Sequence, residues 1–323
     1  MPSDHFNIMW VGPVPESTTT ERSVANLAST CLSNNISAVV FSVGAWIKYS
    51  GGNHTFPYAL AESVSALQNI CIWCHANGLV VGATLYSDLN TSSQFSIDVS
   101  TIDHRNSEVS AVTTILSYGF DFYIDDTEGY TGELNDVIAF WGNMSTAIHA
   151  VNKVSAVYYG MHAWAQGYID DVTVFNSFTS QDFIVARFHP GATNASTELS
   201  LIRNHLPCNW MTQVRIDEGQ DNITSSAVFY NKAFSSGLDA NFQGHSLWAW
   251  YLINNSDWTA WRNWTEKNFP FSGPYPTPSP SPISVPATTF SNEVIYIIAI
   301  ATIVTTSIVA IAMILNKKIT IAT

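Results

Sequence analysis

The chain has 323 residues, 46% of them hydrophobic and 11% charged, and its formal net charge is −13 at pH 7. This length fits one large or two average domains, and the apolar content supplies a core and excludes disorder for most of the chain. Residues 1–269 hold ten Lys and Arg against 24 Asp and Glu, so nucleic acid is not an expected partner.

Short apolar runs alternate with segments of helical periodicity between residues 5 and 269, and they do so eight times. The predicted strands cover residues 5–12, 37–47, 79–87, 120–125, 153–161, 182–189, 209–216 and 245–252, with helices in the gaps. Eight strand-then-helix units in about 265 residues predict an α/β fold, a (β/α)8 TIM barrel over residues 1–269. A doubly wound sheet is the alternative, because periodicity does not show whether the sheet closes.

The second predicted helix has the clearest pattern in the barrel. Its apolar positions before Gly78, which is expected to end the helix, are Leu60, Val64, Leu67, Cys71 and Cys74. The CxxC at residues 71–74 lacks the second pair that a zinc site needs. The four cysteines, Cys31, Cys71, Cys74 and Cys208, are therefore expected to form a structural disulfide or to remain buried thiols.

The C-terminal end differs from the rest of the chain. Residues 294–315 contain no charge over 22 positions, enough to cross a hydrocarbon core of about 30 Å. We expect a Pro/Ser/Thr-rich stalk at 270–292, a transmembrane helix at 293–316 and a short cytoplasmic tail at 317–323 that holds Lys317 and Lys318. The prediction is a single-pass protein of the cell membrane whose barrel is extracellular, and Asn-x-Ser/Thr sites such as Asn222 suit a glycoprotein.

The fourth predicted strand ends in a cluster of acids, "YIDDTE". Because side chains alternate along a strand, Asp126 and Glu128 share one face with Ile124, and Asp125 lies on the other. Acids two residues apart on one face lie about 6–7 Å from each other, close enough to keep one protonated while the other is ionised. The alternative is that these acids cap the following helix.

Polar and aromatic residues also gather at the ends of other predicted strands, where barrel enzymes carry their sites. Aromatic rings beside carboxylates suit sugars, whose C–H faces stack on indoles while their hydroxyls need hydrogen-bond partners. The predicted substrate-binding residues are Asp125, Tyr158, His162, Arg187, His189, Gln213, Arg215 and Trp248.

The stretch "GFDFYIDDTE" resembles the strand-four signature DxxDxDxE of chitinase-like glycoside hydrolases, with Asp121, Asp126 and Glu128 on its first, third and last acidic positions. The second acidic position holds Ile124 instead. "GHSLWAW" resembles the strand-eight segment of that family, with Trp248 at the tryptophan that floors the sugar site. The resemblance implies membership of the TIM-barrel glycoside hydrolase superfamily, with the chitinase-like branch as the nearest motif.

These observations predict a cell-surface glycoside hydrolase that acts on a polysaccharide or glycan without a cofactor. Glu128 is the expected general acid, Asp126 tunes its pKa, and Asp217 or Glu218 acts as nucleophile or base. A non-catalytic glycan-binding or structural surface barrel is the alternative, favoured by Ile124. A third reading, a metal hydrolase using His162, His189 and Asp217, is opposed by the absence of a His-x-His pair in the first strand and of HExxH anywhere.

Overall fold

The computed structural model describes residues 6–13, 20–48, 57–88, 94–160, 171–187, 195–216, 222–235, 237–248 and 250–268. The strands are β1 (Ile8–Pro13), β2 (Ala38–Trp46), β3 (Tyr58–Leu60), β4 (Val80–Tyr86), β5 (Ile97–Asp98), β6 (Phe122–Asp125), β7 (Tyr130–Thr131), β8 (Val154–Gly160), β9 (Phe183–Arg187), β10 (Asn209–Arg215) and β11 (Phe242–Trp248). The helices are α1 (Glu21–Leu32), α2 (Val64–Ala76), α3 (Ile102–Leu116), α4 (Leu134–Ala150), α5 (Asp171–Ser177), α6 (Ala195–His205), α7 (Ile223–Ala233), the short 3-10 helix η2 (Trp250–Leu252) and α8 (Asn255–Asn268).

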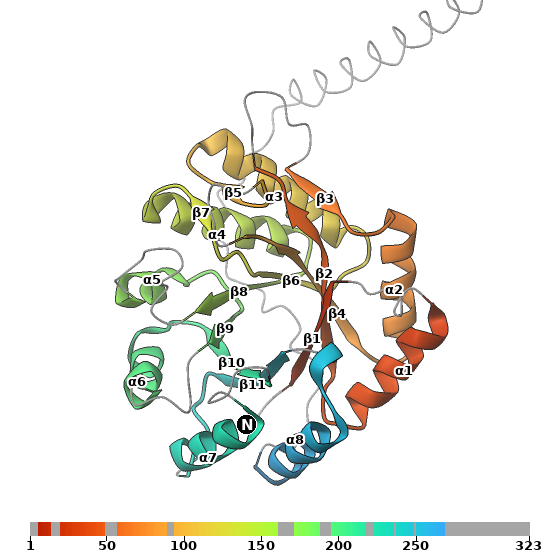
Figure 1. Ribbon diagram of the computed structural model, residues 1–323. Coiled ribbons are helices and arrows are strands. Elements are labelled where there is room, and N and C mark those ends of the chain that lie inside the picture. Colours follow the sequence, from red (N-terminus) through yellow and green to blue (C-terminus); the bar gives the residue numbers. More distant parts are fainter. Residues whose placement is uncertain are drawn as a thin grey trace, which may run out of the picture. The chain divides into compact units, whose positions relative to one another are not determined.

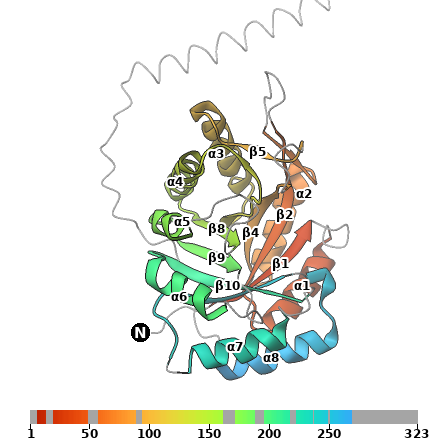
Figure 2. The same cartoon turned by 60° about the vertical axis from the view of Figure 1, so that its left-hand side comes forward.

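The parallel strands close into a ring. The order is β1-β2-β4-β6-β8-β9-β10-β11, and β11 pairs with β1 again. The helices cover the outside of this ring (Figures 1 and 2). The predicted (β/α)8 barrel is therefore confirmed, and the doubly wound sheet is excluded because its edges would stay open.

Three short strands are additions to the eight-stranded barrel. β3 runs antiparallel to β2, and β5 and β7 pair with each other in the connections that follow β4 and β6. None of them was predicted, because two or three residues are too few to show a period.

Two boundaries differ from the predicted ones. Leu60 belongs to β3, and α2 starts only after Ser63, whose side chain accepts a hydrogen bond from the amide of Ala66 at 3.3 Å. The last strand starts at Phe242 instead of residue 245, and Trp250 lies in η2 beyond the strand end. Gly78 follows α2 with a φ of +80°, so its predicted place at the helix end is confirmed.

The core has two layers, as a barrel requires. The inside is filled by residues from alternate positions of the strands, among them Phe122 and Ile124 of β6. Tyr123, between them in sequence, belongs to the larger layer between strands and helices. The alternation predicted for this strand is therefore confirmed, and it decides on which side the following acids emerge.

All four cysteines are free thiols, and Cys31, Cys71 and Cys74 are buried. Burial raises the pKa of Cys74 to about 12, and the charge of Asp121 adds to this effect. The buried thiols, rather than a disulfide, are the outcome that the structure supports.

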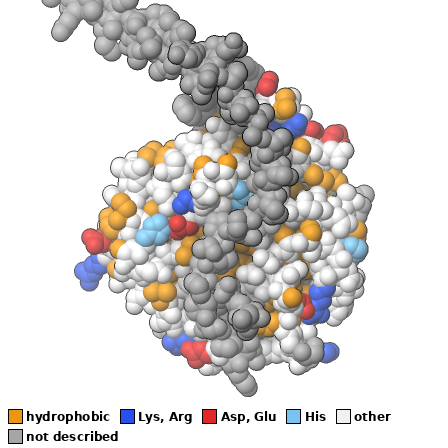
Figure 3. All heavy atoms as spheres, turned by 180° about the vertical axis from the view of Figure 1, so that it is seen from behind, with side chains coloured by type: hydrophobic (Ala, Val, Ile, Leu, Met, Phe, Trp, Pro, Cys, Tyr) orange, Lys and Arg blue, Asp and Glu red, His pale blue; other side chains and the backbone are white. Residues whose placement is uncertain are grey.

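On the face that Figure 3 shows, charged side chains lie scattered among neutral ones rather than in a patch. The predicted stalk, transmembrane helix and tail lie outside the described residues. Within residues 6–268, as far as the structure describes them, no helix combines the length and the apolar character that crossing a membrane requires.

Candidate active site

Asp126 and Glu128 follow β6 directly and line a cavity of about 230 Å³ at the carboxyl ends of the strands. The other predicted residues in its wall are Tyr158 of β8, Gln213 and Arg215 of β10, and Trp248 of β11. The barrel thus brings together six of the predicted site residues from four strands or their ends, at the end of the fold where barrel enzymes carry out their chemistry.

Two aromatic residues of this wall, Tyr158 and Trp248, pack against Trp10. The ring of Trp10 on β1 is 5.7 Å from that of Trp248 and 6.1 Å from that of Tyr158. The Trp10 indole nitrogen donates a hydrogen bond to the hydroxyl of Ser246. The Tyr158 hydroxyl donates to Oε1 of Gln213 at 3.1 Å, so both polar groups are held in fixed orientations.

A second, more apolar cavity of about 320 Å³ adjoins the first. Asp126, Tyr86 and Trp248 line both cavities, and small residues such as Ala45 and Ala59 complete the wall of the second. Asp126 therefore faces the polar and the apolar part of the site at once.

Burial governs the two acids of the site. It raises the pKa of Asp126 well above the usual range, and the charges of Glu128 and Asp125 add to this rise while Arg215 opposes it. Burial also raises the pKa of Glu128, against the effect of Arg187 and Arg215. A carboxyl group whose pKa is raised keeps its proton to higher pH than a free one, which is what general acid catalysis needs.

The two arginines lie beside these acids. The guanidinium of Arg215 is 5.7 Å from the ring centre of Trp248, a cation–π distance. Arg187, at the end of β9, interacts electrostatically with Glu128 and with Tyr158, whose pKa is raised, chiefly by burial. Positive charge at this place favours the ionised form of Glu128.

Asp125 does not join the other predicted residues. It lies on the outer face of β6, fully buried, and accepts hydrogen bonds from Thr127, Tyr130 and Trp141. The predicted contact of Asp125 with substrate is not supported by this position, because the strand alternation turns it away from the cavity.

Three other predicted site residues, Asp217, His162 and His189, lie outside the described residues, as does Glu218. The role of Asp217 or Glu218 as nucleophile or base therefore stays a prediction, and so does the alternative of a metal hydrolase. In the described part of the chain, no cluster of His, Cys, Asp and Glu has a metal-binding arrangement.

The sequence interpretation missed Trp10, Tyr86 and Ser87. Each lies within the last three residues of a predicted strand, and Trp10 continues the inward phase of Phe6 and Ile8. Alternation along the first strand was thus the signal that would have found Trp10, and the position at a strand end was the signal for Tyr86 and Ser87.

A larger hollow than either of these lies elsewhere. It measures about 730 Å³ and lies between α7 and α8, where residues such as Asn222, Val228 and Lys232 line it. Among the described residues of its lining, Asp257 is the acid. Because this lining, as far as the structure describes it, holds no acid pair and lies away from the strand ends, size alone does not make it the active site.

No family model matches the chain, and no curated protein matches its sequence. Solved structures with a similar fold include the xylanase and α-amylase inhibitor protein XAIP-II from Scadoxus multiflorus, at 13% identity and a TM-score of 0.56, covering 84% of this chain and 100% of that one. A family 18 chitinase from Crocus vernus has 12% identity and a TM-score of 0.54, covering 81% of this chain and 98% of that one.

A GH113 β-1,4-mannanase has a similar fold as well, at 11% identity and a TM-score of 0.53, with 82% of this chain and 99% of that one covered. At this level of identity the likeness is one of fold. The barrel of this chain is thus built like those of glycoside hydrolases and of an inhibitor protein.

Proposed function

We propose that the chain is a glycoside hydrolase whose acid pair, Asp126 and Glu128, cleaves a carbohydrate at the mouth of the barrel. The observation that carries the proposal is the pair of carboxyl groups with raised pKa values in a cavity that Trp248 and Tyr158 also line. The chitinase and the mannanase of similar fold support carbohydrate as the substrate class.

Glu128 is the proposed proton donor to the leaving glycosidic oxygen. The pKa of Asp126 is the more strongly raised of the two, so Asp126 is proposed to keep a proton available to Glu128 at higher pH than an ordinary carboxyl group would. Asp217 or Glu218 is the proposed nucleophile or base, as the sequence predicts. Tyr158, Gln213 and the two arginines are proposed to bind the sugar hydroxyls.

The test is turnover by the full chain and by the variant Glu128→Gln. The substrates are chitin oligosaccharides, β-1,4-mannan oligosaccharides and aryl glycosides, and the readout is release of reducing ends. We expect kcat/KM to fall about 10²- to 10⁴-fold in Glu128→Gln. The wild-type rate should fall as the pH rises past the raised pKa of the pair, because the donor proton is then lost.

A matched control is Asp182→Asn, which removes a carboxylate at the amino end of β9, away from the cavity. Its turnover should equal that of the wild type at a temperature where both are folded. Equal turnover in Glu128→Gln and the wild type would remove Glu128 from the reaction.

A non-catalytic carbohydrate-binding barrel is the second candidate. Ile124, fully buried inside the barrel, occupies the position of an acid in the signature that the sequence resembles, and one protein of similar fold is an inhibitor. Binding of oligosaccharides without turnover, equally in the wild type and in Glu128→Gln, is the outcome expected for it.

The location is proposed on sequence grounds. The uncharged residues 294–315, followed by Lys317 and Lys318, support an anchored protein with the barrel outside the cell.

A further inference from the structure

The segment 126–131 between β6 and α4 carries both acids of the candidate site. We propose that Asp125 is a positioning residue for this segment, a buried carboxylate behind the cavity that fixes Asp126 and Glu128 in place. The consequence for catalysis rests on the proposed function, whereas the anchoring of the segment does not.

Asp125 is bonded on both of its oxygens. Its Oδ1 accepts from the Thr127 hydroxyl at 2.7 Å. Its Oδ2 accepts from the Trp141 indole nitrogen at 2.9 Å and from the Tyr130 hydroxyl. Burial raises the pKa of Asp125, and the donors on both oxygens oppose this rise because they favour the ionised carboxylate, which is acceptor-only. Two of the donors, Thr127 and Tyr130, belong to the segment itself, so Asp125 ties its start to its end.

The third donor connects the segment to a helix. Trp141 lies on α4, and its ring is 5.8 Å from that of Tyr130 and 5.0 Å from that of Phe178. The Trp141 nitrogen also donates to the Tyr130 hydroxyl at 2.9 Å. Because these rings are packed together, the donors stay aimed at Asp125.

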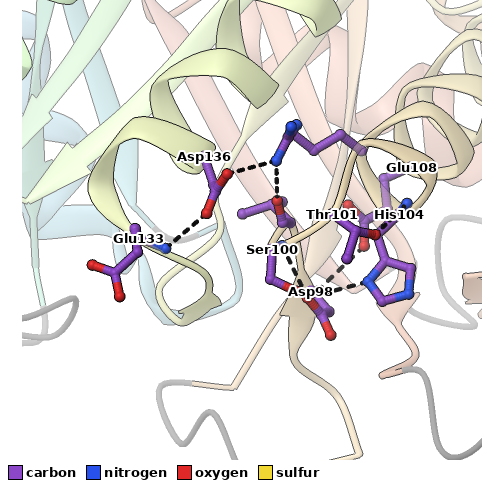
Figure 4. Close-up of polar contacts among 9 residues, drawn as sticks. Asp98, Ser100, Thr101, His104, Glu108, Glu133 and Asp136 are labelled. Carbon is purple, nitrogen blue, oxygen red and sulfur yellow. Dashed lines mark hydrogen bonds and ion pairs between the residues drawn. The ribbon is translucent and has the colours of Figure 1, made fainter.

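The segment and the elements next to it have other supports as well. The amide of Glu128 donates to the hydroxyl of Ser87 at 2.8 Å, and β7 pairs with β5. Behind them, Arg105 of α3 donates to Asp136 of α4 at 2.8 Å and to the carbonyl of Val99 at 2.7 Å (Figure 4). Asp125 bonds the segment directly through both of its oxygens, and it is adjacent in sequence to the acid pair.

The charge of Asp125 also acts on the site directly. Asp125 and Glu128 raise the pKa of Asp126, and Arg215 lowers it. The phenols of Tyr123 and Tyr158 also interact electrostatically with Asp126. Removal of the Asp125 charge should therefore let Asp126 ionise at lower pH.

The experiment compares Asp125→Asn with Asp182→Asn in the full chain in detergent. Asp182 accepts from the amide of Ser155 at 2.8 Å and lies 2.8 Å from His149, so its variant removes a carboxylate with similar bonding at the opposite end of the barrel. The first readout is hydrogen exchange of the amides of 126–131. The second is the titration midpoint of the Asp126 carboxyl carbon in protein labelled with 13C-aspartate, assigned by its loss in Asp126→Asn.

In Asp125→Asn we expect exchange in 126–131 to become about tenfold faster, because one charged hydrogen-bond acceptor is lost. The Asp126 midpoint should move to lower pH. The Asp182→Asn control should change neither. If both readouts stay at the control values in Asp125→Asn, the positioning role is overturned.

A second variant guards against misfolding of Asp125→Asn. Thr127→Val keeps the charge of Asp125 and the side-chain shape but removes one donor. Thr127→Val should accelerate hydrogen exchange in 126–131 and leave the Asp126 titration midpoint above that of Asp125→Asn. Unchanged exchange in Thr127→Val would contradict the positioning role of Asp125. Neither readout uses turnover, so this inference can hold even if the chain proves not to be a glycosidase. Likewise, a failure of the positioning role would not contradict the proposed glycosidase activity.

Discussion

At the scale of single residues, the molecule buries carboxyl groups in different ways. Asp125 has donors on both oxygens, whereas Glu108 of α3, 1% exposed, has little to support a charge. Its Oε1 accepts from the amide of Asp98 at 3.3 Å, and its Oε2 has no hydrogen-bond partner among the described residues (Figure 4). Burial raises the pKa of Glu108 to about 9, so this residue is a neutral acid at pH 7.

Glu108→Gln should therefore gain stability relative to the wild type as the pH rises. The unfolded chain loses the Glu108 proton near its ordinary pKa of 4.5, and the folded chain loses it near 9. Between these values the folded state binds more protons, so the free energy of unfolding of the wild type falls with pH. The glutamine variant lacks this slope, and the gain should reach the order of a few kcal/mol by pH 9.

Urea unfolding of both proteins at pH 5, 7 and 9 measures this difference. A stability difference that stays the same at all three pH values would mean that Glu108 titrates normally in the folded state.

At the scale of elements, an aspartate before β6 and another before β9 make the same kind of contacts. Asp121, before β6, accepts from the amide of Val81 on β4 at 3.0 Å and lies 2.7 Å from His75 of α2. Asp182, before β9, makes the matching pair of contacts with β8 and α4. Asp121 fills the first acidic position of the sequence signature, yet it joins a helix end to two strands at the amino end of the barrel. Its place in the motif thus reflects the fold, not the chemistry.

The seam between the first and last strands depends on Gly244. Its φ is +147°, and an added Cβ would lie 2.0 Å from the carbonyl oxygen of Phe6. The backbone has no freedom to retreat there, because the amide of Phe6 donates to the carbonyl of Gln243 at 2.9 Å and the amide of His245 donates to Asn7 at 2.9 Å. Glycine is therefore required at this point of ring closure.

Gly244→Ala should lower the free energy of unfolding by about 2–4 kcal/mol, from backbone strain and overpacking together. The matched control is Gly142→Ala on α4, where an added Cβ meets nothing within 4 Å. Alanine at that helical position should stabilise by up to about 1 kcal/mol. Thermal unfolding of both variants gives the comparison. Similar effects of the two substitutions would show that the backbone between β1 and β11 can move to accommodate the added Cβ.

The same elements show what the sequence predicts and what it does not. Alternation placed Phe122 and Ile124 inside and Asp126 and Glu128 at the cavity, because one buried strand fixes the phase of the residues directly after it. The last strand was predicted three residues late, since a polar run at 243–245 is typical of a turn. His245 is nevertheless fully buried, with its ring 4.4 Å from that of Trp264, and only the folded chain supplies that partner.

At the scale of the whole molecule, closure of the ring makes the site. Trp10 and Trp248 lie at opposite ends of the barrel sequence, and pairing of β1 with β11 brings their rings to 5.7 Å. A count of strands predicts that closure, but it cannot predict which side chains turn away. The donors of Asp125 come from positions 127, 130 and 141, and they converge only once α4 is packed on the barrel.

The barrel and the predicted anchor should be separable. The described elements end at Asn268 of α8, and that helix is tied to the barrel by Trp261, whose indole nitrogen donates to the carbonyl of Asn34 at 2.8 Å. A chain that ends at residue 269 keeps all of these contacts and loses the uncharged residues 294–315. We expect it to stay in the supernatant after membranes are sedimented, whereas the full chain sediments with them and is released by detergent.

Both forms should unfold at the same temperature in detergent, because the shortened chain keeps every described element of the barrel. Proteolysis of intact cells that express the full chain tests orientation. Cleavage of the barrel with protection of an epitope placed after residue 323 is expected from Lys317 and Lys318 on the cytoplasmic side. A full chain that stays in the supernatant would refute the anchor, and protection of the barrel in intact cells would place it inside the cell, away from extracellular glycans.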